Sequence, residues 1–305
     1  MRFSYLVAVL LCLFALHVSA ADLFRVATYN VENYILRSNE TRSIKSPESR
    51  AKIREHLLAI KADVIALQEL GGADALQDIQ QGLKAGGQEY AHSEIVYGWD
   101  TNIQVAVLSR FPIVARRPHT NDSYLLQGRR FHVGRGFLEV DIRVNPQYTF
   151  TLMTTHLKSR RVVAEGDEAE MREQEGILLR EKIDARLSAN RDVNLVVLGD
   201  FNDVRDARST RAVLGRGRSA LVDTRPAERN GDNLPNPIPR YDPRNITWTH
   251  FFGKEDSYSR IDYILLSPAM AREWVKEESY VFTTANWGLA SDHRPVVAAF
   301  RPETN

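Results

Sequence analysis

The stretch Asn194-Leu-Val-Val-Leu-Gly-Asp-Phe-Asn-Asp203 indicates a buried strand that runs into a polar turn. Its apolar run, 195–198, is rich in β-branched residues and is followed by glycine, which is typical of a strand buried on both faces. Asp200, Asn202 and Asp203 would then cluster at the carboxyl end of a strand, where α/β proteins usually keep their chemistry. A turn that only ends a strand would use the same residues, since Asp and Asn favour turns. This stretch alone leaves both interpretations open.

The segments on either side are expected to alternate between strands and helices. Helical spacing of apolar residues predicts helices over 47–60, 73–83 and 167–189. Short apolar or alternating runs predict strands over 22–30, 62–69, 103–108, 113–115, 137–142, 148–155, 195–198, 246–249, 261–266, 280–283 and 295–300. Polar composition predicts loops over 34–46 and 116–135, and repeated prolines predict an irregular crossing over 226–245. No convincing linker interrupts this series, so a single domain is expected over residues 21–305.

The first 20 residues predict a signal peptide for export. Arg2 precedes an apolar run over 5–16, and Val18-Ser19-Ala20 supplies the small residues of a cleavage site. The apolar run is too short to span a bilayer comfortably, so a retained anchor is the less favoured interpretation. Cleavage near Ala20 would deliver a secreted or periplasmic protein.

Composition limits the chemistry that the mature protein could use. With 305 residues, of which 43% are hydrophobic, the chain is long enough to bury a large core. Cys12 is the only cysteine and would leave with the signal, which excludes disulfides and thiol chemistry. Loss of Arg2 would leave 39 basic and 39 acidic residues, so any polyanion must be held by local patches rather than by net charge. We therefore expect a monomer with no stable membrane association.

Polar residues recur at the ends of six expected strands. They are Asn30, Glu69, His156, Asp200 with Asn202, Asp262, and Asp292 with His293. Hard oxygen ligands without cysteine suit Mg²⁺ or Mn²⁺, and histidines suit proton transfer or phosphate contact near neutral pH. Each residue taken alone could be an ordinary turn or surface residue. Their recurrence at six strand ends favours a single metal-dependent site.

Six short motifs carry a resemblance to a known group. They are Thr28-Tyr-Asn-Val-Glu-Asn33, Leu67-Gln-Glu69, His156-Leu-Lys-Ser159, Gly199-Asp-Phe-Asn-Asp203, Arg260-Ile-Asp-Tyr263 and Ser291-Asp-His-Arg-Pro295. In this order they resemble the endonuclease/exonuclease/phosphatase superfamily and its deoxyribonuclease-I-like, secreted bacterial-type members, over about residues 23–300. The resemblance implies a four-layer α/β/β/α sandwich, in which two mixed β-sheets pack face to face with helices outside.

The resemblance also implies a metal site and a water-activating group. Glu69 would be the principal ligand of Mg²⁺ or Mn²⁺, with Asn30 and Asp292 beside it. Asp200 would orient or deprotonate the attacking water, and Asn202 would hold a phosphate oxygen.

Two histidines receive roles from the same resemblance. His293 would contact the scissile phosphate and would be oriented by Asp262. His156 matches a second catalytic histidine of the deoxyribonuclease-I-like branch. The acid that orients that histidine in the branch is not found here, because the aligned stretch reads Thr101-Asn102-Ile103-Gln104.

These features favour a secreted, divalent-metal-dependent nuclease whose substrate is DNA, or RNA. Local basic groups could follow a phosphate backbone, although exposed arginines are often only solvated. Those expected to bind substrate are Arg129, Arg130, Arg135 and Lys158, with Arg37, Arg42, Lys45, Arg160 and Arg161 nearby in the sequence. A phosphatase or phosphodiesterase for small or lipid phosphates is the alternative, and a non-catalytic binding protein that kept the fold is a third interpretation.

Overall fold

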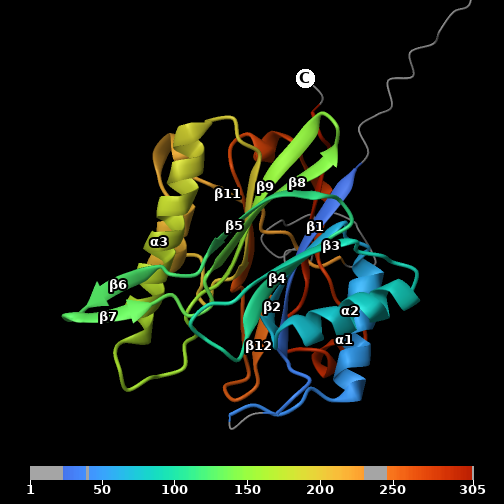
Figure 1. The fold of residues 1–305 in the computed structure, drawn as a ribbon, viewed down its shortest axis with the longest axis horizontal. Coiled ribbons are helices and arrows are strands. Elements are labelled where there is room, and N and C mark those ends of the chain that lie inside the picture. Colours follow the sequence, from blue (N-terminus) through green and yellow to red (C-terminus); the bar gives the residue numbers. More distant parts are fainter. Residues whose placement is uncertain (1–22, 39–40, 230–245, 304–305) are drawn as a thin grey trace, which may run out of the picture.

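The computed structural model describes residues 23–38, 41–229 and 246–303, and within them two six-stranded mixed sheets lie between helices (Figure 1). In the first sheet β1 and β2 are parallel and the other neighbours are antiparallel. Its strands, in spatial order, are β15 (Trp274–Val281), β16 (Val296–Phe300), β1 (Phe24–Tyr34), β2 (Val64–Leu70), β4 (Gln104–Ser109) and β3 (His92–Val96).

The second sheet has the same design, with one parallel pair, β9 and β10. Its strands are β11 (Val222–Asp223), β14 (Asp262–Leu266), β10 (Leu195–Asp200), β9 (Tyr148–His156), β8 (Phe137–Asn145) and β5 (Ile113–His119). Two hairpins lie outside the sheets: β6 (Ser123–Leu126) with β7 (Arg129–His132), and β12 (His250–Phe252) with β13 (Ser257–Ser259). Figure 1 shows the β6–β7 hairpin extending away from the body of the molecule.

Helices cover the outer faces of both sheets. Figure 1 shows α1 (Pro47–Ile60) and α2 (Ala73–Ala85) on one side and α3 (Glu168–Ala189) on the other. The other helices of the described residues are α4 (Arg208–Leu214), which packs on α3, and the short 3-10 helices Gly217–Ser219, Met270–Arg272 and Trp287–Leu289.

Buried apolar side chains form three layers that match this arrangement. One layer lies between the sheets and includes Val26, Val107, Leu152, Leu198 and Ile264. The second lies beneath α1 and α2, and the third beneath α3. Two sheets with helices outside, separated by three apolar layers, confirm the predicted four-layer sandwich.

Strand register brings the polar strand ends to one edge of the molecule. Asp200, the last residue of β10, pairs with His156, the last residue of the parallel strand β9. It also pairs with Asp262, the first residue of the antiparallel strand β14. In the first sheet, Asn30 of β1 pairs with Gln68 of the parallel strand β2.

Gly199 is required at this edge. Its φ is +136°, and a Cβ atom there would lie 2.0 Å from the carbonyl oxygen of Thr155 on β9. A side chain would therefore force β9 and β10 apart, next to Asp200 and His156. The glycine of the decisive sequence stretch permits close pairing of the two strands.

The loop predicted over 116–135 is wrong. Strand β5 continues to His119, and the β6–β7 hairpin follows it. Along the edge strand β5 the exposed residues Val114, Arg116 and Pro118 alternate with less exposed ones, and the part beyond Ala115 is mostly polar. A polar edge strand lacks the apolar run by which buried strands are recognised.

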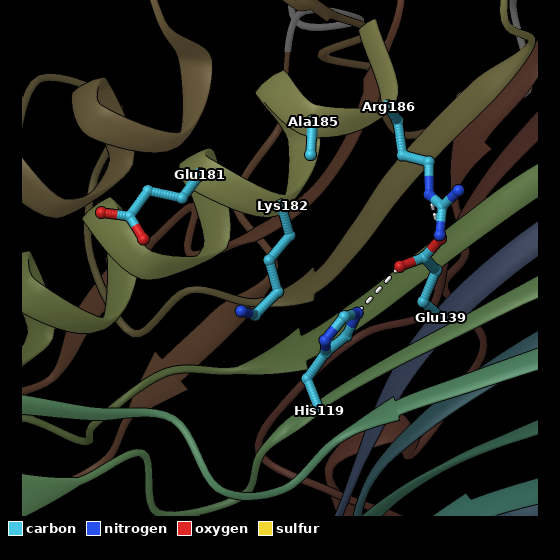
Figure 2. Close-up of a pocket in the computed structure, with 6 residues that line it drawn as sticks. All are labelled: His119, Glu139, Glu181, Lys182, Ala185 and Arg186. Carbon is cyan, nitrogen blue, oxygen red and sulfur yellow. Dashed lines mark hydrogen bonds and ion pairs between the residues drawn. The ribbon is translucent and has the colours of Figure 1, made fainter. Parts of the chain in front are cut away.

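Arg117 of β5 takes part in a charged network beneath α3. Figure 2 shows the part of this network in which Glu139 lies between His119 and Arg186. Arg117 Nε lies 2.5 Å from Glu139, which also binds Arg186 of α3 at 2.5 Å and His119 at 2.8 Å. Burial opposes ionisation of Glu139, but these hydrogen bonds outweigh it and lower its pKa to about 2. The network borders a cavity of about 380 Å³ and joins the helix to the sheet edge.

Other boundaries also differ from expectation. The strand predicted over 246–249 is wrong, since the strand begins at His250, and β3, β11, β13 and α4 were not predicted. Of the crossing predicted over 226–245, residues 230–245 lie outside the described residues, as does the predicted signal peptide. Among the helices that the structure describes, none is long and apolar enough to cross a bilayer.

The fold buries a histidine that must stay neutral. His56 of α1 is 1% exposed; its Nδ1 lies 3.0 Å from the Tyr29 hydroxyl, and its Nε2 has no partner in the described structure. Burial, helped by the charge of Lys52, lowers the pKa of His56 to about 4. The unfolded chain, with a His pKa of about 6.5, therefore binds this proton first as pH falls.

We predict that His56 does not affect the free energy of unfolding above pH 6.5, and that it lowers this free energy progressively as pH falls toward 4. From pH 7.5 to 4.5 it should lower the free energy of unfolding by about 2–3 kcal/mol. Urea unfolding at both pH values measures this loss, which His56→Gln should remove because Gln takes no proton. His92→Gln, at a partly exposed histidine of β3, should keep the wild-type pH dependence. An equal loss in wild type and His56→Gln would contradict the prediction.

Candidate active site

Asp200 is the centre of the polar edge. It is 1% exposed; Asn30 Nδ2 donates to its Oδ2 at 2.9 Å, and the Asn202 backbone N–H donates to its Oδ1 at 2.7 Å. Burial raises the pKa of Asp200 to about 6, the positive charge of His293 opposes this rise, and the charge of Asp262 adds to it. A carboxylate with this pKa is a suitable proton acceptor near neutral pH.

His293 and Asp262 form a buried pair. Nδ1 of His293 lies 2.8 Å from Asp262 Oδ2, and its Nε2 lies 3.8 Å from Asp200 and 3.8 Å from Asp292. Burial alone would lower the pKa of His293, but the charges of Asp262 and Asp200 outweigh it and raise the pKa well above the ordinary value. The imidazolium can therefore donate from Nε2 toward the site.

His156 also lies beside Asp200, but its ring is neutral, whereas that of His293 is positively charged. His156 Nε2 is 3.5 Å from Asp200 Oδ2 and 3.9 Å from Glu69 Oε1. Burial, with the positive charge of Arg135 next, holds the pKa of His156 well below its ordinary value. Its Nδ1 has no hydrogen-bond partner in the described part of the chain, which agrees with the absence of an orienting acid from the sequence.

Glu69 lies near the end of β2, where it contacts Asn30 of the neighbouring strand β1. Asn30 Nδ2 donates to its Oε1 at 3.2 Å, and the Asn33 backbone N–H donates to its Oε2 at 2.9 Å. The Asn30 side-chain oxygen accepts from the Glu32 backbone at 2.9 Å. Glu32, Asn33 and Glu69 all have positive φ, a conformation that non-glycine residues rarely adopt and that clusters at functional sites.

The carboxylates at this point fit a hard divalent cation. Burial raises the pKa of Glu32, and the charges of Asp292 and Glu69 raise it further, against the opposing charge of Lys45. These acids therefore repel one another, and a dication bound by oxygen atoms would relieve the repulsion.

Glu69, Asp292 and the Asn30 amide oxygen are the predicted ligands. Asn30 contacts Glu69 through its amide nitrogen, and its backbone carbonyl accepts from the hydroxyl of Ser291, the neighbour of Asp292, at 2.8 Å. The Asn30 amide oxygen accepts from the Glu32 backbone, so it would have to turn toward a bound metal.

Asn202 and Lys158 are both held by hydrogen bonds within the protein. The Asn202 side-chain amide donates to the Leu157 carbonyl at 3.0 Å, and its φ is +54°. The Lys158 backbone N–H donates at 2.6 Å to Glu175, a fully buried acid of α3 that also accepts from the Gly134 backbone at 3.2 Å. Glu175 thus ties the loop after β9 to α3, a role that its place in a charged helix did not reveal.

The three predicted substrate-binding arginines lie in two different places. Arg129 and Arg130 are exposed on β7 of the projecting hairpin. Arg135 is 8% exposed, its Nε lies 3.5 Å from Asp100, and its charge lowers the pKa of His156. Arg135 therefore belongs to the buried centre, whereas the other two do not.

His250 of β12 is a site residue that the sequence did not reveal. Its backbone bridges to His293, the two ring centroids are 4.5 Å apart, and its Nε2 lies 3.6 Å from Asp292 Oδ2. Burial would raise the pKa of Asp292, but the interaction with His250 and the charge of His293 hold it below its ordinary value. The only signal in the sequence was the aromatic stretch Trp248-Thr-His-Phe-Phe252, which includes the first strand of the hairpin that precedes Asp262.

Two cavities open beside these residues, and Glu32 borders both. One, of about 610 Å³, carries the basic residues Arg42, Lys45 and Arg161. The other, of about 670 Å³, is lined by Phe251, Phe252, Lys254, Asn286, Trp287 and Asp292. The centre therefore has a basic cavity on one side and a largely aromatic cavity on the other.

Comparisons with solved structures show the same fold in several proteins. Sphingomyelinase C from Streptomyces griseocarneus is 19% identical, with 92% of this chain and 100% of that chain covered and a TM-score of 0.61. Beta toxin from Staphylococcus aureus is 18% identical, covering 90% and 99%, with a TM-score of 0.62. The human nocturnin catalytic domain is 17% identical, covering 92% and 97%, with a TM-score of 0.60. A search of curated protein sequences finds no match.

The sequence profile described as "Endonuclease/Exonuclease/phosphatase family" matches residues 27–293. This span contains every strand end of the site, from Asn30 to His293. The match and the shared fold confirm the family expected from the six motifs. The chain belongs to the endonuclease/exonuclease/phosphatase family, a superfamily of metal-dependent phosphoester hydrolases.

Proposed function

We propose that this hydrolase is an exported, Mg²⁺- or Mn²⁺-dependent nuclease that hydrolyses phosphodiester bonds of DNA, with RNA as the other polymer to test. The observation that carries the proposal is the basic cavity with Arg42, Lys45 and Arg161. It reaches Asn33, whose backbone binds Glu69, so a second phosphate of a polymer could bind while the first lies at the metal ligands. A small monoester would leave this cavity unused.

The metal would be held by Glu69, Asp292 and Asn30. When bound, it would polarise the scissile phosphate and stabilise the charge that develops on its oxygens. The oxygen-rich donor set favours Mg²⁺ or Mn²⁺. Asp200 and Asn202 lie next to this ligand set, on the second sheet.

Asp200 accepts a proton from the attacking water in this proposal. Asn30 and the Asn202 backbone hold its two oxygens, so the carboxylate cannot rotate away from the site. Its raised pKa, about 6, makes it a stronger base than an exposed aspartate while leaving it mostly ionised at pH 7.

The two histidines stabilise the phosphate in different ways. His293, positively charged and fixed by Asp262, donates from Nε2 to a non-bridging oxygen, where negative charge grows during in-line attack. His156 is neutral and donates a hydrogen bond rather than a full proton.

Asn202 and Lys158 would complete the set that contacts phosphate. The Asn202 amide now donates to the Leu157 carbonyl, and Lys158 Nζ lies 3.5 and 3.4 Å from the carbonyls of Ser159 and Arg161, so both would exchange these contacts for substrate.

The β6–β7 hairpin would extend the contact with a polymer. Arg129 and Arg130 are exposed there, and Trp99 stacks on His132 of the same hairpin at 3.6 Å between ring centroids. Exposed basic and aromatic side chains together suit a nucleic-acid backbone and its bases. Export follows from the leader over residues 1–20 and stays a proposal from the sequence.

A lipid phosphodiester is the second candidate substrate. The cavity beside Asp292 is lined by Phe251, Phe252 and Trp287, and Phe252 is 39% exposed. Tyr258, on the paired strand β13, is 55% exposed. An apolar surface next to the metal ligands could accept an acyl chain, and sphingomyelinase C from Streptomyces griseocarneus shares the fold.

We predict that the mature protein hydrolyses bis-nitrophenyl phosphate and plasmid DNA with Mg²⁺ or Mn²⁺, and that chelation abolishes both reactions. Asp200→Ala and His293→Ala should each lower kcat by about 10²–10⁴-fold or more, since each removes a proton-transfer or charge-stabilising group. Asp206→Ala, at an exposed turn acid, is the matched control and should keep the wild-type rate. Full activity in chelator after verified metal loss would contradict the metal assignment.

We predict that Arg129→Ala/Arg130→Ala raises KM on long DNA and reduces the slope of log binding constant against log salt by about 1.8, for two lost phosphate contacts. The rate on bis-nitrophenyl phosphate should not change, because that substrate does not reach the hairpin. The control variant Arg143→Ala/Arg191→Ala removes the same charge from two exposed arginines, one in β8 and one two residues after the end of α3. It should leave the salt slope unchanged.

Two outcomes would count against nucleic acid as the substrate. One is an unchanged salt slope in the hairpin variant. The other is faster hydrolysis of sphingomyelin vesicles than of DNA by the same wild-type preparation, which would favour the lipid candidate. Arg135→Ala is a separate case: this arginine is buried beside His156, so its loss should lower the rates on DNA and on bis-nitrophenyl phosphate together.

A further inference from the structure

Three side chains next to the catalytic centre have the composition of a transition-metal site. In the described part of the chain, ligand atoms of His250, Asp292 and His293 all lie within 4.8 Å of one another. His250 Nε2 is 3.6 Å from Asp292 Oδ2, and His293 Nε2 is 3.8 Å from Asp292 Oδ1. Two imidazole nitrogens and one carboxylate suit Zn²⁺, whereas Mg²⁺ prefers oxygen ligands alone.

The spacing is close to what Zn²⁺ requires. Ligands at about 2.0–2.1 Å in a tetrahedral site lie roughly 3.3–3.4 Å apart. The His250 and His293 nitrogens lie 3.6 and 3.8 Å from different oxygens of Asp292, so each needs to approach the carboxylate by a few tenths of an ångström. The two histidine nitrogens lie within 4.8 Å of each other and would also have to move closer. Asp292 is 40% exposed at its side chain and His250 is 16% exposed, so both can adjust. A water molecule would complete the four ligands on the open side.

His293 is oriented as metal-binding histidines usually are. Its Nδ1 is bonded to Asp262 at 2.8 Å, which leaves Nε2 facing His250 and Asp292. Asp200, Asp262 and Asp292 surround this ring with negative charge that would favour a bound cation. The cavity of about 670 Å³ that includes Asp292 provides a path from solvent.

We propose that His250, Asp292 and His293 bind Zn²⁺, and that this binding inhibits the hydrolase. Inhibition follows because Zn²⁺ would take Asp292 from the Mg²⁺ or Mn²⁺ ligand set. It would also displace the proton of His293 Nε2 to solvent, so that this nitrogen no longer donates to the phosphate. This second part depends on the proposed function, while binding itself does not. His250 distinguishes the two metal sites, since it belongs to the Zn²⁺ site alone.

Binding is tested by titrating metal-free protein with Zn²⁺ in a calorimeter and with Co²⁺ by visible absorption. Wild type should bind one Zn²⁺ per chain, and Co²⁺ should show the absorption of a site with nitrogen ligands. His250→Gln should weaken Zn²⁺ binding by at least ~10-fold, because it removes one ligand. His92→Gln, which removes a histidine of β3, should bind as wild type does. Thermal unfolding of each variant checks its fold, and His250→Asn serves as a second variant.

Inhibition is tested with bis-nitrophenyl phosphate at saturating Mg²⁺. Zn²⁺ should inhibit wild type and His92→Gln over the range in which it binds, and His250→Gln should need at least ~10-fold more Zn²⁺. Equal Zn²⁺ affinity in wild type and both His250 variants, or no binding to wild type, would overturn the site. Stimulation by Zn²⁺, or equal inhibition of wild type and His250→Gln, would overturn the inhibitory role. If wild type binds Zn²⁺ but hydrolyses no phosphodiester with Mg²⁺, the proposed function fails and the Zn²⁺ site stands.

Discussion

The hydrogen bond from Asn30 Nδ2 to Asp200 Oδ2, 2.9 Å long, joins the two sheets where their polar strand ends meet. A buried carboxylate is costly unless it is hydrogen-bonded, so this contact favours one relative position of the sheets. Two further buried hydrogen bonds form a second link between the sheets. The Thr28 hydroxyl donates to Gln68 at 3.1 Å, and the Gln68 amide donates to the Thr154 hydroxyl of the second sheet at 3.2 Å. The apolar layer holds the sheets together, and these polar contacts align them. The geometry of the site depends on that alignment, because its residues come from both sheets.

Backbone strain at the site is concentrated in four non-glycine residues with positive φ, namely Glu32, Asn33, Glu69 and Asn202. Such conformations cost on the order of 1–3 kcal/mol each and persist only where neighbouring contacts enforce them. Here the Asn33 backbone binds Glu69 at 2.9 Å, and the Asn202 backbone binds Asp200 at 2.7 Å. The strained backbone therefore points N–H groups at Glu69 and Asp200, the carboxylates for which we propose metal binding and water activation. These contacts within the protein fix the positions of both carboxylates.

The six short motifs predicted the sandwich through the family that they resemble, and local patterns located many of the strands and the polar residues at their ends. Buried strands such as 195–198 are continuous apolar runs, and their ends carry the six motifs. The prediction ended the strand at Ala115, whereas β5 continues to His119, and contacts with distant residues such as Glu139 stabilise this polar continuation. The roles of Arg135 and His250 also depend on contacts between distant segments, so composition could not separate Arg135 from Arg129 or place His250 beside Asp292. Local patterns identify strand ends, but burial decides which charged residues belong to the centre.

The charge states at the centre follow from one difference between two buried histidines. His293 has Asp262 on Nδ1 and is held positive, whereas Nδ1 of His156 has no partner in the described structure and the ring stays neutral. Asp200 lies between them, 3.8 Å from one ring and 3.5 Å from the other, with a pKa of about 6. A cationic donor, a neutral donor and a weakly basic carboxylate are thus set apart by environment rather than by residue type. A chain whose acidic and basic residues nearly balance can therefore act on phosphate, because it concentrates its charge where the two sheets meet.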